Sequence, residues 1–108
     1  MDDRRNSQRI NVSFPVECVL LPERKKMFYT VSKDLSGEGL KILSEEFMAR
    51  GKFIKLSINL INEMAESKVK VIWCNKKARS DRYYIGLKIM EINTIDKSHL
   101  YHFINKII

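Results

Sequence analysis

The sequence predicts a mainly β protein, a small six-stranded antiparallel β-barrel with a C-terminal α-helix. Six short segments alternate apolar and polar residues, which is the pattern of strands with one buried face. Polar or charged turns separate these segments at short intervals, as in small barrels. From Thr94 the apolar residues recur at spacings of three and four, which indicates an amphipathic helix. This helix most simply covers an open side or end of the barrel.

The chain begins with residues 1–9, which are polar and charged without any period and are predicted to form a flexible arm. Alternation runs through residues 10–20 and predicts the first strand. Pro15 lies on the opposite parity and indicates a bulge or an unpaired edge position. A charged turn at 22–26 leads into the second strand, which is predicted over 27–31.

The remaining strands are separated by segments that carry signals of their own. After the third strand, Phe47 and Met48 are predicted to form an apolar plug in a loop or single helical turn. Gly86, inside the sixth strand, indicates a close approach or a bulge. Thr94 or Asn93 is expected to cap the helix. The predicted segments are 40–43, 53–61, 69–74 and 83–90 for the third to sixth strands, 75–81 for a basic hairpin loop, and 94–107 for the helix.

The composition favours one folded domain with an anionic partner. With 108 residues and 44% apolar content, the chain can bury one hydrophobic core. The formal charge of +7 is compatible with nucleic acid, an anionic nucleotide, a membrane surface or an acidic protein. Cys18 and Cys74 lie within apolar strand-like runs, so we expect buried thiols rather than a disulfide framework or a metal site.

The sequence gives little support for a membrane protein or for an enzyme. No apolar run approaches the ~18 residues of a transmembrane helix, and the first residues do not begin a signal peptide, so we expect a cytoplasmic protein. No nucleophile–base pair, metal-ligand spacing or glycine-rich phosphate loop is evident, so we expect no enzyme, no metal and no cofactor. His99 and His102 lie near the polar or boundary faces of the helix, where an ordinary structural role is expected.

The segment from Asp34 to Gly39 has the spacing D-x-S-x-x-G and lies between two apolar runs, as a turn joining two strands does. Asp34 offers a carboxylate acceptor, and Ser36 offers a hydroxyl that donates and accepts. Two positions apart on a strand, they would share a face. Gly37 and Gly39 would allow a positive φ and leave room for a ligand. A hairpin turn capped by its own aspartate and serine is the alternative.

A second motif, R-x-x-x-R at Arg5 and Arg9, precedes the first strand. Arginine can fork onto phosphate, stack on a base and hydrogen bond guanine. A solvated basic tail is the alternative interpretation of such a run. Each motif is weak alone. The succession of R-x-x-x-R, one strand and then D-x-S-x-x-G about 25 residues later is much more specific.

With these two motifs the sequence resembles the PilZ domain, a bacterial receptor for cyclic di-GMP. The resemblance covers almost the whole chain, since 71–73 and 84–89 are similar to the family's late strands, which often carry a tryptophan and then an apolar–glycine–apolar run. It implies a split-barrel fold with a terminal helix, and cyclic di-GMP as the ligand. The matched ligand-binding positions are Arg5, Arg9, Asp34, Ser36 and Gly39. Arg4 is a further candidate, because the residue before R-x-x-x-R bears on whether the family binds one ligand or a stacked pair.

Together, the motifs and the resemblance predict a receptor and adaptor. Ligand binding would order residues 1–9 over the barrel face and alter contact with a protein effector; the chain would be a monomer or a ligand-dependent dimer, without a stable nucleic-acid complex. Two alternatives stay open. A basic nucleic-acid-binding barrel would use Trp73, Tyr83, Tyr84 and the loop 76–79, although we expect Trp73 in the core and the loop in solvent. An adaptor with the same fold would bind no nucleotide.

Overall fold

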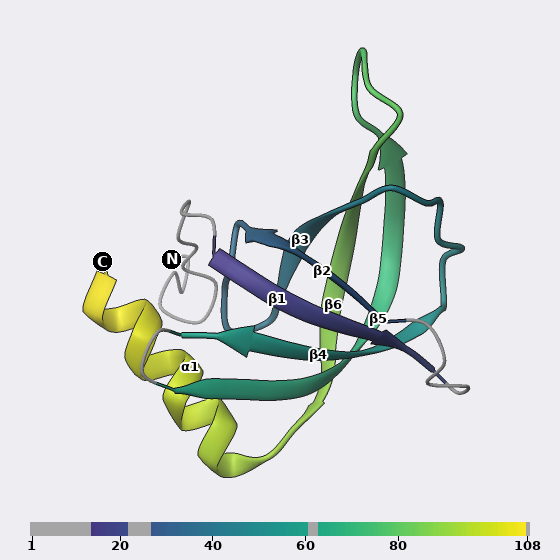
Figure 1. Cartoon of the computed structure of the whole chain (residues 1–108). Coiled ribbons are helices and arrows are strands. Elements are labelled where there is room, and N and C mark those ends of the chain that lie inside the picture. The colour runs from purple at the N-terminus through teal and green to yellow at the C-terminus, as the bar shows by residue number, and fades with distance from the viewer. Residues whose placement is uncertain (1–13, 22–26, 61–62, 108) are drawn as a thin grey trace, which may run out of the picture.

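The computed structural model describes residues 14–21, 27–60 and 63–107, which form six strands and one helix (Figure 1). All strand pairs are antiparallel, and the strands close into a barrel in the order β1-β2-β3-β6-β5-β4. The predicted fold class is confirmed. The elements are β1 (Phe14–Leu20), β2 (Met27–Lys33), β3 (Gly39–Ser44), β4 (Phe53–Asn59), β5 (Met64–Lys76), β6 (Tyr83–Ile92) and α1 (Thr94–Ile107).

Alternation along the strands fills the interior of the barrel. In β4, Ile54, Leu56 and Ile58 are fully buried, while Phe53 and Asn59 at its ends are exposed. Burial of such an aliphatic side chain contributes about 1.5–3 kcal/mol, so the inward faces of the strands supply most of the stabilisation. The core residues on the other strands are Val16, Cys18, Leu40, Ile42, Ala65, Val69, Val71, Ile85 and Leu87.

The fifth strand is longer than the sequence predicted, because β5 begins at Met64 and not at Val69. Its first part has small inward residues, Ala65 and Ser67, and an exposed Met64, so its inward face carries little apolar signal. Asn59 of β4 lies opposite Met64, and the pairing of these two strands defines the start of β5. β5 and β6 are therefore the two longest strands of the barrel.

The first strand is described from Phe14, so the predicted start of alternation at Ile10 lies outside the described residues. Pro15 lies opposite Val31 of β2, and pairing of β1 with β4 begins only at Val16. Pro15 therefore occupies the open end of β1 on its β4 side, as expected for a residue that lacks a backbone N–H.

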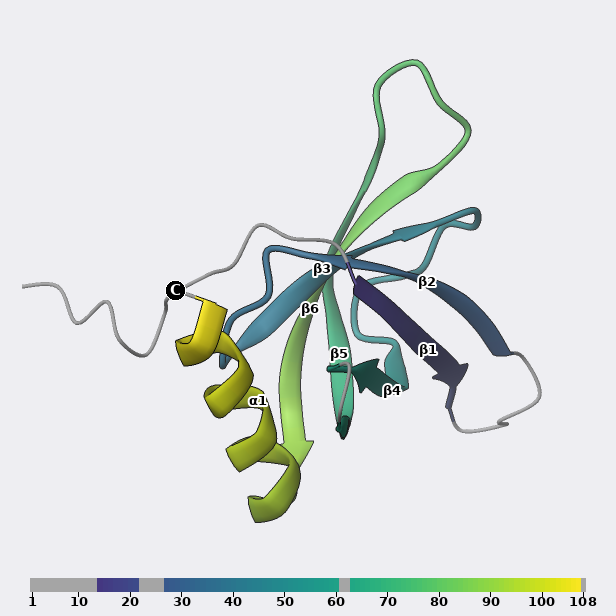
Figure 2. The ribbon, with the colours of Figure 1, turned by 60° about the vertical axis from the view of Figure 1, so that its left-hand side comes forward.

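The helix α1 packs beside β5 on the outside of the barrel (Figures 1 and 2). Asn93 is its N-cap: the Asn93 side-chain oxygen accepts the Asp96 N–H at 2.8 Å, and the Asp96 carboxylate accepts from the Asn93 amide at 2.9 Å. Leu100 and Ile104 are buried against the core. Within the described ranges, no helix has the length and apolar character needed to cross a membrane.

The loop between β3 and β4 only partly matches its prediction. Met48 is buried, as a plug should be, but Phe47 is 63% exposed and packs edge-to-face on Tyr83 with ring centroids 5.9 Å apart. The Ser44 hydroxyl accepts the Glu46 N–H at 3.1 Å and starts the loop, which contains no helical turn. Phe47 therefore lies on the surface and not in the core.

Both cysteines are free thiols. Cys18 is fully buried, and this burial, together with Glu17 beside it, raises the pKa of its thiol to about 12. The thiol is therefore protonated at neutral pH and acts as a small apolar packing group. Cys74 is half-buried at the edge of the core, so its predicted burial is only partial.

Candidate ligand-binding site

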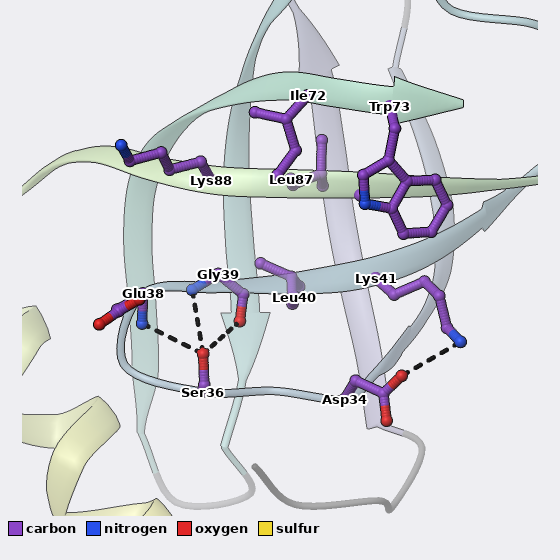
Figure 3. A pocket seen from close by; sticks show the side chains of 11 residues that line it. Asp34, Ser36, Glu38, Gly39, Leu40, Lys41, Ile72, Trp73, Leu87 and Lys88 are labelled. Carbon is purple, nitrogen blue, oxygen red and sulfur yellow. Dashed lines mark hydrogen bonds and ion pairs between the residues drawn. The ribbon is translucent and has the colours of Figure 1, made fainter. Parts of the chain in front are cut away.

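A pocket of about 560 Å³ lies outside the barrel wall, where the β2–β3 loop faces β5 and β6 (Figure 3). It brings together three of the predicted site residues, Asp34, Ser36 and Gly39. Its volume falls within the usual range for small-molecule sites. The full lining is Asp34, Ser36, Glu38, Gly39, Leu40, Lys41, Ile72, Trp73, Gly86, Leu87 and Lys88.

The D-x-S-x-x-G segment is a loop, which corrects the expectation that Asp34 and Ser36 share the face of a strand. β2 ends at Lys33, and Asp34 turns the chain with a φ of 52°. Aspartate tolerates this left-handed conformation better than most residues with a Cβ. Leu35 is fully buried and anchors the loop on the core. Asp34 and Ser36 are therefore held on either side of a fixed apolar side chain.

The Ser36 hydroxyl fixes the shape of the loop. It accepts the N–H groups of Glu38 and Gly39 at 3.2 and 3.3 Å, and it donates to the Gly39 carbonyl at 3.2 Å. The Ser36 N–H donates to the same carbonyl at 2.9 Å. These bonds satisfy the side chain within the protein, so the alternative of a serine-capped turn describes its local role. A bond from Ser36 to a ligand stays a prediction.

The two glycines of the loop allow close contacts with neighbouring elements, Gly39 with β6 and Gly37 with α1. Neither has a positive φ, contrary to prediction; in this loop the left-handed residue is Asp34. A Cβ on Gly39 would lie 2.2 Å from the Leu87 carbonyl oxygen of β6, and one on Gly37 would lie 2.5 Å from Tyr101 of α1. Gly39 is therefore required by the close approach of β3 and β6, even though it also lines the pocket.

Two lysines bring positive charge to the pocket. Lys41 lies 3.1 Å from the Asp34 carboxylate and 4.7 Å from the centroid of the Tyr84 ring. Both members of the ion pair are partly exposed, so the pair contributes about 0–1 kcal/mol. Lys88, on the opposite wall, makes no ion pair with a carboxylate of the described residues. Within the described part of the chain, the pocket thus contains one ammonium group that is paired with a carboxylate and one that is not.

Trp73 forms part of the pocket wall and is 38% exposed, which contradicts the expectation that it lies in the core. The β5–β6 register shifts between Val71 and Trp73, so Ile72 is an extra residue and both Ile72 and Trp73 face the pocket. The indole lies directly on Gly86, where an added Cβ would be 2.2 Å from its ring. Of the two alternatives predicted at Gly86, the close approach is the one observed, and the bulge lies opposite it in β5.

Lys41, Trp73 and Lys88 were not predicted to bind cyclic di-GMP, although the nucleic-acid alternative used Trp73. Lys41 follows Gly39 at a spacing of two, so its outward direction could have been read from the alternation of β3. A tryptophan in one strand and a glycine in the next are compatible with a ring that lies on the neighbouring strand. The bulge that turns the Trp73 ring outward, however, cannot be predicted from the sequence.

The pocket has the chemistry of a site for an anionic, planar ligand. Two ammonium groups can contact phosphate, the indole can stack on a base, and the Asp34 carboxylate can accept from an N–H edge. The described residues hold no cluster of three or more His, Cys, Asp and Glu side chains that could bind a metal ion. The predicted contributors Arg4, Arg5 and Arg9 lie outside the described residues.

Comparison with solved structures shows the same fold in three proteins. The Bacillus subtilis inhibitor of motility MotI/DgrA matches with a TM-score of 0.80 at 18% identity, over 97% of this chain and 51% of its own. The PilZ domain of CeSA from a cellulose-synthesising bacterium gives 0.68 at 17%, over 94% and 98%. The Escherichia coli YcgR PilZ domain with c-di-GMP gives 0.67 at 12%, over 92% and 88%. This chain thus spans about half the length of MotI/DgrA.

At these identities the structural matches establish the fold alone. No curated protein sequence matches the chain. The model of the PilZ domain family, in contrast, matches residues 3–106, which is nearly the whole chain. The matched range includes the R-x-x-x-R motif and the D-x-S-x-x-G motif. The chain belongs to the PilZ domain family.

Proposed function

We propose that this chain is a receptor for cyclic di-GMP and an adaptor for a protein effector. The observation that carries the proposal is the pocket in which Asp34, Ser36 and Gly39 lie together with Lys41, Trp73 and Lys88. Membership of the PilZ family supports it, as does the structural match to the YcgR domain, whose structure is described with c-di-GMP.

Each part of the ligand finds a complementary group. The Asp34 carboxylate accepts from the N1–H and amino group of one guanine, and the Trp73 indole offers a surface for base stacking. Lys41 and Lys88 neutralise phosphate, and Arg5 and Arg9 add forked contacts from the chain before β1. Binding orders residues 1–9 over the pocket, and this new surface is presented to the effector.

An adaptor that binds no nucleotide is the second candidate, and two contacts favour it. Asp34 is already paired with Lys41 at 3.1 Å, and the Ser36 hydroxyl is satisfied by Glu38 and Gly39. In this view the motif residues serve only to shape the loop. A ligand must compete with Lys41 for the Asp34 carboxylate, so the two candidates differ in whether that ion pair opens.

Calorimetric titration with cyclic di-GMP, and with GTP and cyclic di-AMP as controls, separates these candidates. We expect binding of cyclic di-GMP alone, weakened about ten-fold or more in the Arg5→Ala, Arg9→Ala, Asp34→Ala and Trp73→Ala variants through loss of charged or stacking contacts. Phe53→Ala, which removes an exposed aromatic ring outside the pocket, is the matched control and should bind normally.

Each outcome of this titration decides a different part of the proposal. A wild-type protein that binds no cyclic di-GMP supports the adaptor without nucleotide. Equal binding of cyclic di-AMP refutes the guanine-reading role of Asp34. Binding that survives both Asp34→Ala and Trp73→Ala places the ligand elsewhere on the barrel.

A further inference from the structure

The hairpin that joins β5 to β6 projects beyond the barrel wall (Figure 1, top). β4 pairs with β5 only as far as Lys70, and β3 pairs with β6 only as far as Tyr83. Tyr83 is the first residue of β6, so only the connection from Lys77 to Arg82 extends beyond both neighbouring strands. A backbone bond of 2.8 Å from the Lys77 N–H to the Arg82 carbonyl closes its base. Figure 2 shows the same projection from another side. This tip buries no part of the barrel core.

The projecting tip is strongly basic. We define it as the hairpin tip, residues 76–82, which contains four cations and one carboxylate, Asp81. Among the described residues, no ion pair joins any of the four cations to a carboxylate. Lys76, Arg79 and Arg82 are exposed, and positive charge that no carboxylate of the described residues neutralises favours an external anionic partner. The four cations are Lys76, Lys77, Arg79 and Arg82.

The aromatic rings at the base of the tip favour a protein partner over a nucleic acid. The tip itself contains no aromatic residue, and single-strand binding depends on free ring faces on which bases stack. The Tyr84 ring is approached by Lys41 at 4.7 Å and by Lys77 at 5.9 Å. Tyr83 packs against Phe47, which remains 63% exposed. An exposed aromatic beside basic residues is typical of protein interfaces.

We propose that the hairpin tip and Phe47 form a docking surface for an acidic segment of a partner protein. Carboxylates of the segment contact the four cations, and an apolar side chain at one end of the segment contacts Phe47. Glu45 and Glu46 precede Phe47 and would repel carboxylates there, so the segment must be acidic at one end and apolar at the other. Neither Phe47 nor any residue of the hairpin tip lines the pocket, so this surface is separate from the proposed ligand site.

Fluorescence anisotropy with labelled probes tests this proposal. The probes are a short glutamate-rich peptide ending in leucines, an all-glutamate peptide of equal length, and an oligothymidylate of equal charge. We expect the leucine-ended peptide to bind best. The triple variant Lys76→Glu, Lys77→Glu, Arg82→Glu should weaken its binding about ten-fold, because exposed ion pairs contribute modestly one by one. Arg79 is left unchanged because its φ is 59°.

A matched control reverses three lysines away from the hairpin tip, Lys52→Glu, Lys97→Glu and Lys106→Glu, which changes the net charge by the same amount. Equal loss in both triple variants would show a nonspecific charge effect and overturn the proposal. So would absence of peptide binding, or tighter tip-dependent binding of the oligothymidylate, which would assign the tip to nucleic acid. Phe47→Ala should weaken only the leucine-ended peptide, and thermal unfolding of each variant checks its fold.

Discussion

The β2–β3 loop and the hairpin tip are both short polar connections, yet the barrel constrains them to very different degrees. In the loop, Leu35 is buried, Ser36 is hydrogen bonded internally, and both glycines lie against neighbouring elements. In the tip, the cations form no ion pair with a carboxylate of the described residues, and no tip residue belongs to the buried core. Substitutions in the β2–β3 loop therefore affect the fold as well as any bound ligand, whereas substitutions in the hairpin tip affect only what the tip contacts outside the barrel.

Substitution of Gly39 should break the loop with the largest effect. In Gly39→Ala, the new methyl would meet the Leu87 carbonyl oxygen at 2.2 Å, and that carbonyl belongs to a paired strand that cannot move alone. Overpacking against backbone should lower the free energy of unfolding by about 3 kcal/mol. Urea denaturation followed by circular dichroism measures it. A loss below about 0.5 kcal/mol would show that β3 and β6 separate easily.

Gly37→Ala should have a smaller effect, because its methyl meets the side chain of Tyr101 and not backbone. A ring can rotate away, so we expect a loss of about 1 kcal/mol. Combining Gly37→Ala with Tyr101→Ala should recover part of that loss in a double-mutant cycle. Additive effects of the two substitutions would mean that the loop and α1 are not in contact, and that only β6 constrains the loop.

The hairpin tip should show the smallest effects. Lys76→Ala and Arg82→Ala remove exposed side chains that form no ion pair within the described residues, so each should change the free energy of unfolding by less than about 0.5 kcal/mol. The same denaturation experiment compares them with the loop variants. Destabilisation equal to that of Gly37→Ala would abolish the contrast between the two connections.

The elements that the sequence predicted well are those whose buried positions carry large apolar side chains. β4 and α1 show this, since Ile54, Leu56, Ile58, Leu100 and Ile104 are buried where alternation and spacing predict, although Ile95 is 69% exposed. The start of β5 was hidden because Ala65 and Ser67 face inward without an apolar signature. Phe47 was placed inside because hydrophobicity does not reveal which of two adjacent apolar residues faces the core.

The site was predicted in part, and for a physical reason. Asp34, Ser36 and Gly39 could be named because their spacing matches a family motif, and the structure brings them into one pocket. Trp73 and Lys88 come from strands distant in sequence, and only the closure of the barrel places them opposite the loop. The roles of Arg5 and Arg9 stay predictions, since they lie outside the described residues.

The bulge in β5 has a consequence for specificity. Before it, odd-numbered residues such as Val69 and Val71 face the core, and after it the inward residue is Cys74. One added residue thus places Ile72 and Trp73 side by side on the outer wall, while the residues that face the interior stay aliphatic. Substitutions at these two positions can change the pocket wall while the residues of the interior stay the same, so the proposed site can change its specificity without loss of the fold.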